Sequence, residues 1–185
     1  MVLSSYSKIN LSLLVNSKQK SGLHNIQSYF CLINLKDKIK IKKIDGKSDK
    51  INFTGPFSKL INKKDNSIKS VLGLLRKLKL ISSYYSVVVK KNIPVFAGLG
   101  GGTSNAFTVM KYVLRKKLSK KNFNIIKKKI GSDLELFFYK QGFLKNLGSI
   151  INQKIKQTFF FVLIKPPIKC STRAVSYTHL RAHET

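Results

Sequence analysis

The alternation of apolar and polar residues predicts strands in the N-terminal and central parts of the chain. Residues 5–15 alternate around Lys8, which is typical of a strand with one buried face. Residues 24–35 predict a second strand on the same grounds. Residues 38–44 alternate lysine with isoleucine, which predicts an edge strand whose charges discourage pairing with other chains. Residues 83–93 are rich in residues that favour strands and predict another.

The remaining periodicity predicts three helices and two short strands. Apolar residues spaced three and four apart over residues 66–80 predict a helix, with Asn66 or Ser67 as its cap. A Gly55-Pro56 turn precedes it. The other predicted elements are helices over 103–118 and 121–130, the second ended by Gly131, and strands over 143–150 and 159–164. Together they predict an α+β fold, with strands first and helices around a glycine-rich loop.

Length and composition limit the chain to one ordinary core and, at most, the start of another. The chain has 185 residues, of which 43% are hydrophobic. No apolar run is long enough for a transmembrane helix, and the N-terminus lacks the zones of a signal peptide. Cys31 and Cys170 form neither a disulfide framework nor a zinc pattern. We therefore expect a cytoplasmic protein.

The formal net charge of +29 has two interpretations. It could mark a surface for nucleic acid or an acidic membrane. It could also reflect the joint abundance of lysine, asparagine and isoleucine that AT-rich coding sequences produce. Arginine and aromatic residues do not interleave into a base-stacking surface, which favours the compositional interpretation over a nucleic-acid partner. In either case the field attracts anionic substrates such as nucleotides.

The last residues differ in composition from the rest of the chain. Lysine is absent after Lys169, while arginine and histidine become frequent. Residues 175–185 resemble a translated sequencing-adapter tail, so we expect the natural sequence to stop being represented near Ala174. The spacing of His179 and His183 suits a metal, but no acidic residue or cysteine lies in position to complete a site.

The strongest functional signal is the glycine-rich segment between a predicted strand and a predicted helix. Glycines allow unusual backbone angles and close approach of a ligand. Their N–H groups and the N-terminus of the following helix form an anion site. Thr103 and Ser104 can cap that helix and contact phosphate or Mg²⁺. The segment therefore predicts a phosphate-binding loop made of Pro94, Val95, Phe96, Ala97, Gly98, Leu99, Gly100, Gly101, Gly102, Thr103 and Ser104.

The spacing of this loop excludes several well-known phosphate motifs. A Walker A loop needs a lysine after its last glycine, and none follows Gly102. The dinucleotide and protein-kinase loops both need a glycine where Thr103 stands. A plain glycine-rich linker is the alternative, although a linker rarely ends in a helix cap.

The run Gly98–Ala106 resembles the phosphate loop of the GHMP kinases, and the order of the other motifs narrows the resemblance to one branch. That branch phosphorylates a cytidine-diphosphate-linked methylerythritol in the non-mevalonate isoprenoid pathway. The supporting segments are Tyr6–Leu11, Gly22–Ser28, Gly55-Pro56, Asp65-Asn66, Gly131–Phe137 and Pro166–Thr172. The resemblance implies a GHMP kinase N-terminal domain with a ribosomal-protein-like two-layer fold over residues 1–155. Residues 156–174 would begin a C-terminal domain that is largely missing, and 175–185 would be the non-native tail.

The resemblance also implies roles for individual residues. Asp133 would accept the proton of the substrate 2-hydroxyl, and Lys8 would orient Asp133 and neutralise phosphate charge. The loop over residues 94–104 would bind ATP. Asn10, His24 and Thr172 would contact the substrate. From the residues alone, Lys8 could be one more exposed lysine and Asp133 could simply cap a helix.

ATP and Mg²⁺ are the implied cofactors, with the metal held by ATP and with Ser104 as the side chain that could also reach it. Two residues depart from the branch pattern. Leu23 replaces a tyrosine that stacks on cytosine, and Glu135 replaces a proline after the catalytic aspartate. The implied partner is a small molecule rather than a membrane. The alternatives are a GHMP kinase of the homoserine or mevalonate type, and a basic RNA-binding module.

Overall fold

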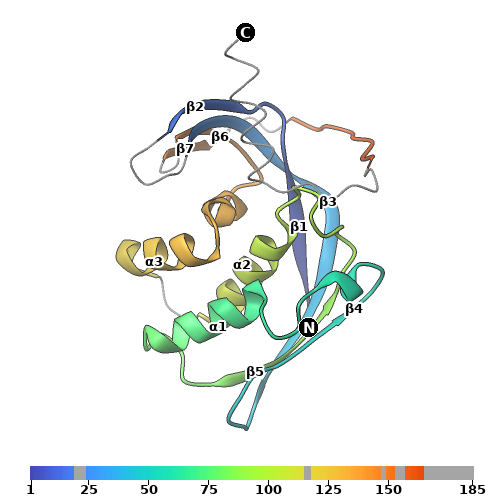
Figure 1. The fold of residues 1–185 in the computed structure, drawn as a ribbon, viewed down its shortest axis with the longest axis vertical. Helices are drawn as coiled ribbons and strands as arrows, with labels where there is room; N and C mark the ends of the chain where they lie inside the picture. The colour runs from blue at the N-terminus through green and yellow to red at the C-terminus, as the bar shows by residue number, and fades with distance from the viewer. Residues whose placement is uncertain (19–23, 115–117, 147–148, 153–156, 165–185) are drawn as a thin grey trace.

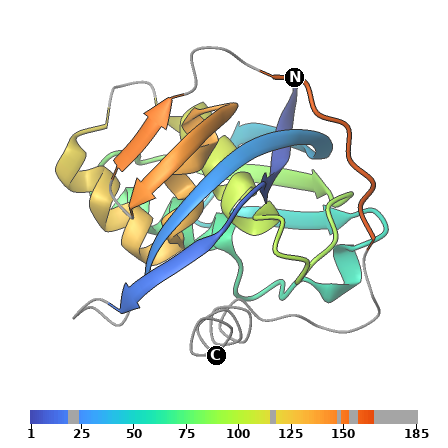
Figure 2. The same ribbon diagram turned by 90° about the horizontal axis from the view of Figure 1, so that it is seen from above.

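The computed structural model describes residues 1–18, 24–114, 118–146, 149–152 and 157–164. They form an α+β fold in which helices cover one face of a curved seven-stranded sheet (Figures 1 and 2), and this confirms the predicted fold class. The strands are β1 (Val2–Asn10), β2 (Leu14–Lys18), β3 (His24–Ile44), β4 (Lys50–Thr54), β5 (Tyr84–Lys90), β6 (Gln141–Asn146) and β7 (Ser149–Asn152). The α-helices are α1 (Ser67–Lys77), α2 (Gly101–Val113) and α3 (Lys120–Ile130), and the 3₁₀ helices are η1 (Ser58–Leu60) and η2 (Ser132–Phe138).

Strand β3 is the centre of the sheet, and the predicted edge strand over residues 38–44 is its second half. The prediction of an edge was wrong for residues 38–40, because they pair with β1 on one side and with β5 on the other, as in Ser4–Lys38–Lys90. Residues 41–44 continue the pairing with β5 beyond the end of β1. Ile39 and Ile41 are buried toward the helices, while the alternating lysines are exposed. The alternation therefore reported one solvent-exposed face of the sheet and not a free edge.

Residues 5–15 do not form the single strand that their alternation predicts. Strand β1 ends at Asn10, and β2 begins at Leu14. Within β1, the pairing with β3 shifts between Tyr6, opposite Lys36, and Ser7, opposite Ile33. The Ser7 hydroxyl donates to the Leu35 carbonyl at 2.7 Å within this irregularity. A bulge of this kind changes the direction of the side chains that follow it, and here it precedes Lys8.

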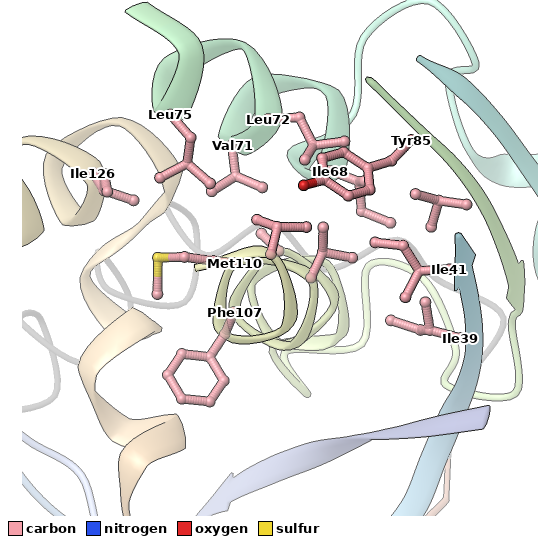
Figure 3. Packing of buried hydrophobic residues seen from close by; sticks show 14 of the residues in the cluster. Ile39, Ile41, Ile68, Val71, Leu72, Leu75, Tyr85, Phe107, Met110 and Ile126 are labelled. Carbon is pink, nitrogen blue, oxygen red and sulfur yellow. The ribbon is translucent and has the colours of Figure 1, made fainter. Parts of the chain in front are cut away.

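The main core lies between the sheet and the helices (Figure 3). Ile68, Val71, Leu72 and Leu75 form the apolar stripe of α1, and each is at most 1% exposed. They pack with residues from β3, β5, α2 and α3. Cys31 of β3 is a buried free thiol, and burial raises its pKa, so the reactive thiolate is disfavoured.

The caps predicted for α1 and for the end of α3 agree with the structure. The cap predicted for the helix after the loop was wrong, because α2 already begins at Gly101 and Thr103 and Ser104 lie inside it. Asn66 accepts the N–H of Lys69 at 3.0 Å and caps α1. Gly131 ends α3 with a φ of 144°. Residues 143–150 are divided between β6 and β7, and β4 was not predicted. Residues 159–164 were predicted as a strand but adopt no regular structure, and Phe160 is 94% exposed. Within the described residues, no helix combines the length and apolar character needed to cross a membrane.

The core predicts the effect of truncating a helix residue. Leu72→Ala should lower the free energy of unfolding by about 2–5 kcal/mol, because it leaves a cavity where Leu72 is fully buried. Urea denaturation measures this loss. The control is Leu60→Ala, at a side chain that is 52% exposed, which should change stability by less than about 0.5 kcal/mol. Equal losses for the two variants would contradict the packing described here.

Candidate active site

Lys8 lies where β1, the glycine-rich loop and η2 meet. Its ammonium is 3.1 Å from Asp133 Oδ2 and donates to Asn10 Oδ1 at 3.2 Å. The Lys8 side chain is 7% exposed, whereas that of Asp133 is 30% exposed, so the pair reaches the surface at the carboxylate. Most lysines in the described residues are exposed, whereas Lys8 is buried and paired with a carboxylate, as Lys91 also is.

The main chain of the loop is attached directly to Lys8. The Lys8 N–H donates to the Leu99 carbonyl at 3.0 Å. Gly98 and Gly100 have left-handed φ values of 69° and 68°, which glycine adopts without strain. Phe96 has a φ of 60°, which is uncommon for an aromatic residue, and its side chain is 55% exposed at the loop. Such strained positions are frequent in ligand-binding loops.

Gly100 is required by the close approach of Lys8. A Cβ atom at Gly100 would lie 3.2 Å from Lys8 Cγ and 3.2 Å from Phe137 Cζ. The aliphatic part of Lys8 therefore passes over the loop backbone, with the Phe137 ring of η2 beside it. Gly100 also precedes α2 as its N-cap and offers no side chain to the first N–H groups of the helix. Free N–H groups at a helix N-terminus can bind an anion.

Ser104 faces the sheet rather than the loop. Its hydroxyl lies 2.8 Å from the Ser5 hydroxyl, which also donates to Asn105 Oδ1 at 2.8 Å, and Ser104 is 1% exposed. These buried bonds attach α2 to β1. Ser67 of α1 attaches the same helix from the other side, since its hydroxyl donates to the Gly102 carbonyl at 2.7 Å.

Asp133 stands on η2 and not in a cap. Gly131 precedes that 3₁₀ helix as its N-cap, and no side-chain bond caps it. A Cβ at Gly131 would lie 3.4 Å from Thr103 Oγ1, so η2 begins beside the first turn of α2. Glu135, two residues further along η2, pairs with Lys127 at 2.5 Å and is not part of the contact with Lys8.

The other predicted residues lie at varying distances from this cluster. Asn10 is exposed and contacts Lys8. His24 begins β3 opposite Lys18, and the structure describes only its backbone. Leu23 and Thr172 lie outside the described residues, as do the tail and the part of the predicted C-terminal domain that follows residue 164.

A groove of about 400 Å³ lies next to Asn10, because its lining includes Leu11, the residue that follows Asn10 in the sequence. The groove is lined by Leu11, Ser12, Tyr29, Phe30, Gln141, Gly142, Gln157 and Phe159.

Two buried contacts beside the loop were missed by the sequence reasoning. One is the buried pair Asp37–Lys91 at the start of the loop, and the other is the Ser5–Ser104 contact. Asp37 is an isolated acid in a lysine-rich strand, and this is the one signal that could have identified it.

A family match spans the loop and Asp133. Residues 66–139 match the family described as GHMP kinases N terminal domain. This segment runs from α1 to η2, so the part of the chain that carries the loop and Asp133 is similar to the N-terminal domain of the GHMP kinases.

The relatives point to one kinase in particular. The chain is 41% identical over 176 residues to the 4-diphosphocytidyl-2-C-methyl-D-erythritol kinase of Pelagibacter ubique (strain HTCC1062). The aligned residues cover 92% of this chain and 62% of that protein. The chain thus spans about three fifths of the length of the curated relatives it matches.

Solved structures support the fold. The crystal structure of 4-(cytidine 5'-diphospho)-2C-methyl-D-erythritol kinase matches with a TM-score of 0.61 at 21% identity, over 82% of this chain and 54% of that one. The mevalonate pyrophosphate decarboxylase from Streptococcus pyogenes matches with a TM-score of 0.63 at 16% identity, over 95% of this chain and 58% of that one. Enzymes with different reactions share this fold, so the fold alone does not select a substrate.

The contact between Lys8 and Gly100 predicts different effects at two loop glycines. Gly98→Ala and Gly100→Ala each introduce a left-handed alanine, which costs about 1–2 kcal/mol. Gly98 has open space around it, whereas a Cβ at Gly100 would displace Lys8 or Phe137. Urea denaturation should therefore show the larger loss for Gly100→Ala. A loss at Gly98 equal to or greater than that at Gly100 would contradict the packing of Lys8 against the loop.

Proposed function

We propose that this chain is the ATP-binding part of an enzyme that phosphorylates the 2-hydroxyl of 4-diphosphocytidyl-2-C-methyl-D-erythritol. The observation that carries the proposal is the Lys8–Asp133 pair beside Gly100 of the glycine-rich loop. It supplies a cation, a carboxylate and a phosphate site at one place. The similarity to kinases with this name over 92% of the chain supports the choice of substrate. The reaction belongs to the non-mevalonate isoprenoid pathway, in the cytoplasm.

Phosphoryl transfer depends mainly on positioning and charge stabilisation. The N–H groups of residues 98–103 bind the phosphates of ATP, whereas the Ser104 N–H donates to the Gly100 carbonyl at 2.9 Å. The exposed side chain of Phe96 in the same loop is available to contact the nucleotide. The substrate hydroxyl donates its proton to Asp133 while its oxygen attacks the γ-phosphorus, and ADP leaves. Lys8 holds Asp133 in place and neutralises charge that develops on the transferred phosphoryl group.

In the proposed reaction, Mg²⁺ would be held mainly by the phosphate oxygens of ATP. The described residues contain no cluster of three or more His, Cys, Asp or Glu side chains. Ser104 would have to leave its bond to Ser5 to reach a metal. Mg²⁺ keeps several waters and takes substrate phosphate oxygens readily, and it neutralises phosphate charge when bound.

Substrate contacts complete the proposal. Asn10, which is exposed beside Lys8, and His24 would contact the cytidine-diphosphate end of the substrate. Thr172 would contact it from the second domain. With Leu23 in place of the stacking tyrosine, the cytosine ring needs another partner in this protein.

The acceptor assay tests the substrate. The protein, extended by its natural C-terminal sequence, should release ADP with 4-diphosphocytidyl-2-C-methyl-D-erythritol. It should not release ADP with homoserine, mevalonate or galactose. Release with one of these three instead would keep the kinase class and overturn the substrate. Failure to release ADP with any acceptor would overturn the proposed function.

Two carboxylates on η2 provide a matched test of the mechanism. Asp133→Asn should lower kcat by about 100-fold or more, which is the usual scale for a general base. Glu135→Gln changes the same chemical group two residues away, where the carboxylate pairs with Lys127 and not with Lys8, and it should leave kcat within a few-fold. Near-normal turnover of Asp133→Asn, with active Glu135→Gln as the reference, would remove Asp133 from the reaction.

A further inference from the structure

The buried ion pair Asp37–Lys91 lies at the start of the glycine-rich loop, and the mechanism above does not use it. Asp37 is 0% exposed and Lys91 is 2% exposed. We propose that this pair is a positioning device for nucleotide phosphates: it fixes the entry of the loop and holds an ammonium group beneath the N-terminus of α2. This inference rests on the proposed function, because it concerns the affinity of that same loop for ATP.

Asp37 holds the backbone where β5 turns into the loop. Its Oδ1 accepts the N–H of Asn92 at 2.7 Å and the N–H of Ile93 at 2.9 Å. Its Oδ2 pairs with the Lys91 ammonium. The Asn92 side-chain amide donates to the Lys36 carbonyl at 3.1 Å, which adds a second bond between the loop entry and β3. The residues before Pro94 therefore have little freedom.

The backbone of Lys91 is fixed independently of its charge. Its N–H donates to the Thr54 carbonyl at 2.7 Å, and its carbonyl accepts the N–H of Phe57 at 3.4 Å. Gly55 packs so closely that a Cβ there would lie 2.8 Å from the Lys91 carbonyl oxygen. These backbone contacts would hold the chain in place without the ammonium of Lys91. The charge of the Lys91 side chain therefore has a reason other than fixing the backbone.

The ammonium of Lys91 points under the first residue of α2. It lies 3.4 Å from the position that a Cβ on Gly101 would occupy. A helix N-terminus already carries partial positive charge, so a cation beneath it is unfavourable for an isolated helix. The same cation is favourable when phosphate binds at the helix N-terminus. In the absence of phosphate, the carboxylate of Asp37 balances the charge of the Lys91 ammonium.

Stability alone does not account for such a pair. Replacing a buried ion pair with uncharged side chains of similar volume is often neutral or stabilising. A second pair, Asp49–Arg76, has the same design at the other end of β5, where Asp49 accepts the N–H of Tyr85 at 2.9 Å. This pair also holds the backbone at one end of β5, but it lies at the end away from the glycine-rich loop. It is therefore the matched control.

The test compares two double variants of the full-length protein in titrations with N-methylanthraniloyl-ATP and Mg²⁺, followed by fluorescence. Asp37→Asn with Lys91→Met keeps an oxygen for the two N–H groups and removes both charges, and it should weaken binding about tenfold. Asp49→Asn with Arg76→Met should leave binding within about twofold. In turnover assays, only the first variant should raise KM for ATP, and KM for the acceptor should stay unchanged.

A single variant covers the case in which the first double variant does not fold. Lys91→Gln keeps a hydrogen-bond donor for Asp37 without the positive charge, and it should show the same loss. Nucleotide binding within about twofold of the unaltered protein, in either folded variant, would overturn the inference, as would an equal loss in the Asp49–Arg76 control. If the unaltered protein binds no nucleotide, the proposed function fails and this inference fails with it.

Discussion

The passage of Lys8 over Gly100 is the constraint on which the rest of the site depends. The Lys8 side chain reaches Asp133 only by crossing the loop backbone at a residue without a Cβ atom. The Lys8 N–H holds the same loop through the Leu99 carbonyl. One residue of β1 therefore sets both the position of the loop and the orientation of the carboxylate. A pair of side chains held in this way has its geometry defined before any ligand binds, as the proposed catalytic role requires.

The elements around this crossing are attached at several independent points. Ser5 bonds to Ser104 and Asn105 and joins α2 to the sheet, while Ser67 joins α2 to α1. Asp37 and Lys91 fix the loop entry from beneath. The proposed phosphate site is thus built on the ends of regular elements, which hold functional groups more firmly than a free loop does. The bulge between Tyr6 and Ser7 contributes as well, because Ser5 and Lys8, three residues apart, both face α2.

The parts of the structure that depend on local sequence could be predicted, and those that depend on distant pairing could not. The stripe of α1, its Asn66 cap and the Gly131 stop follow from neighbouring residues, and the structure has them. The resemblance to GHMP kinases singled out Lys8 and Asp133, which the structure brings together, although it does not test their roles. Alternation over residues 38–44 reports burial on one face and says nothing about neighbours on either side, so the central place of β3 was missed. The direction of the Ser104 hydroxyl and the pairing of Asp37 with Lys91 depend on contacts across 99 and 54 positions, which no local pattern contains.

We propose that the phosphates of ATP lie on the loop beside the Lys8–Asp133 pair. The decisive measurement is a crystal structure of the full-length protein with Mg²⁺ and the non-hydrolysable analogue β,γ-imido-ATP. We expect phosphate oxygens within hydrogen-bond distance of the N–H groups of residues 98–103, with the γ-phosphate facing Lys8 and Asp133. Phosphates bound instead to the exposed lysines of β3, with the loop empty, would contradict it.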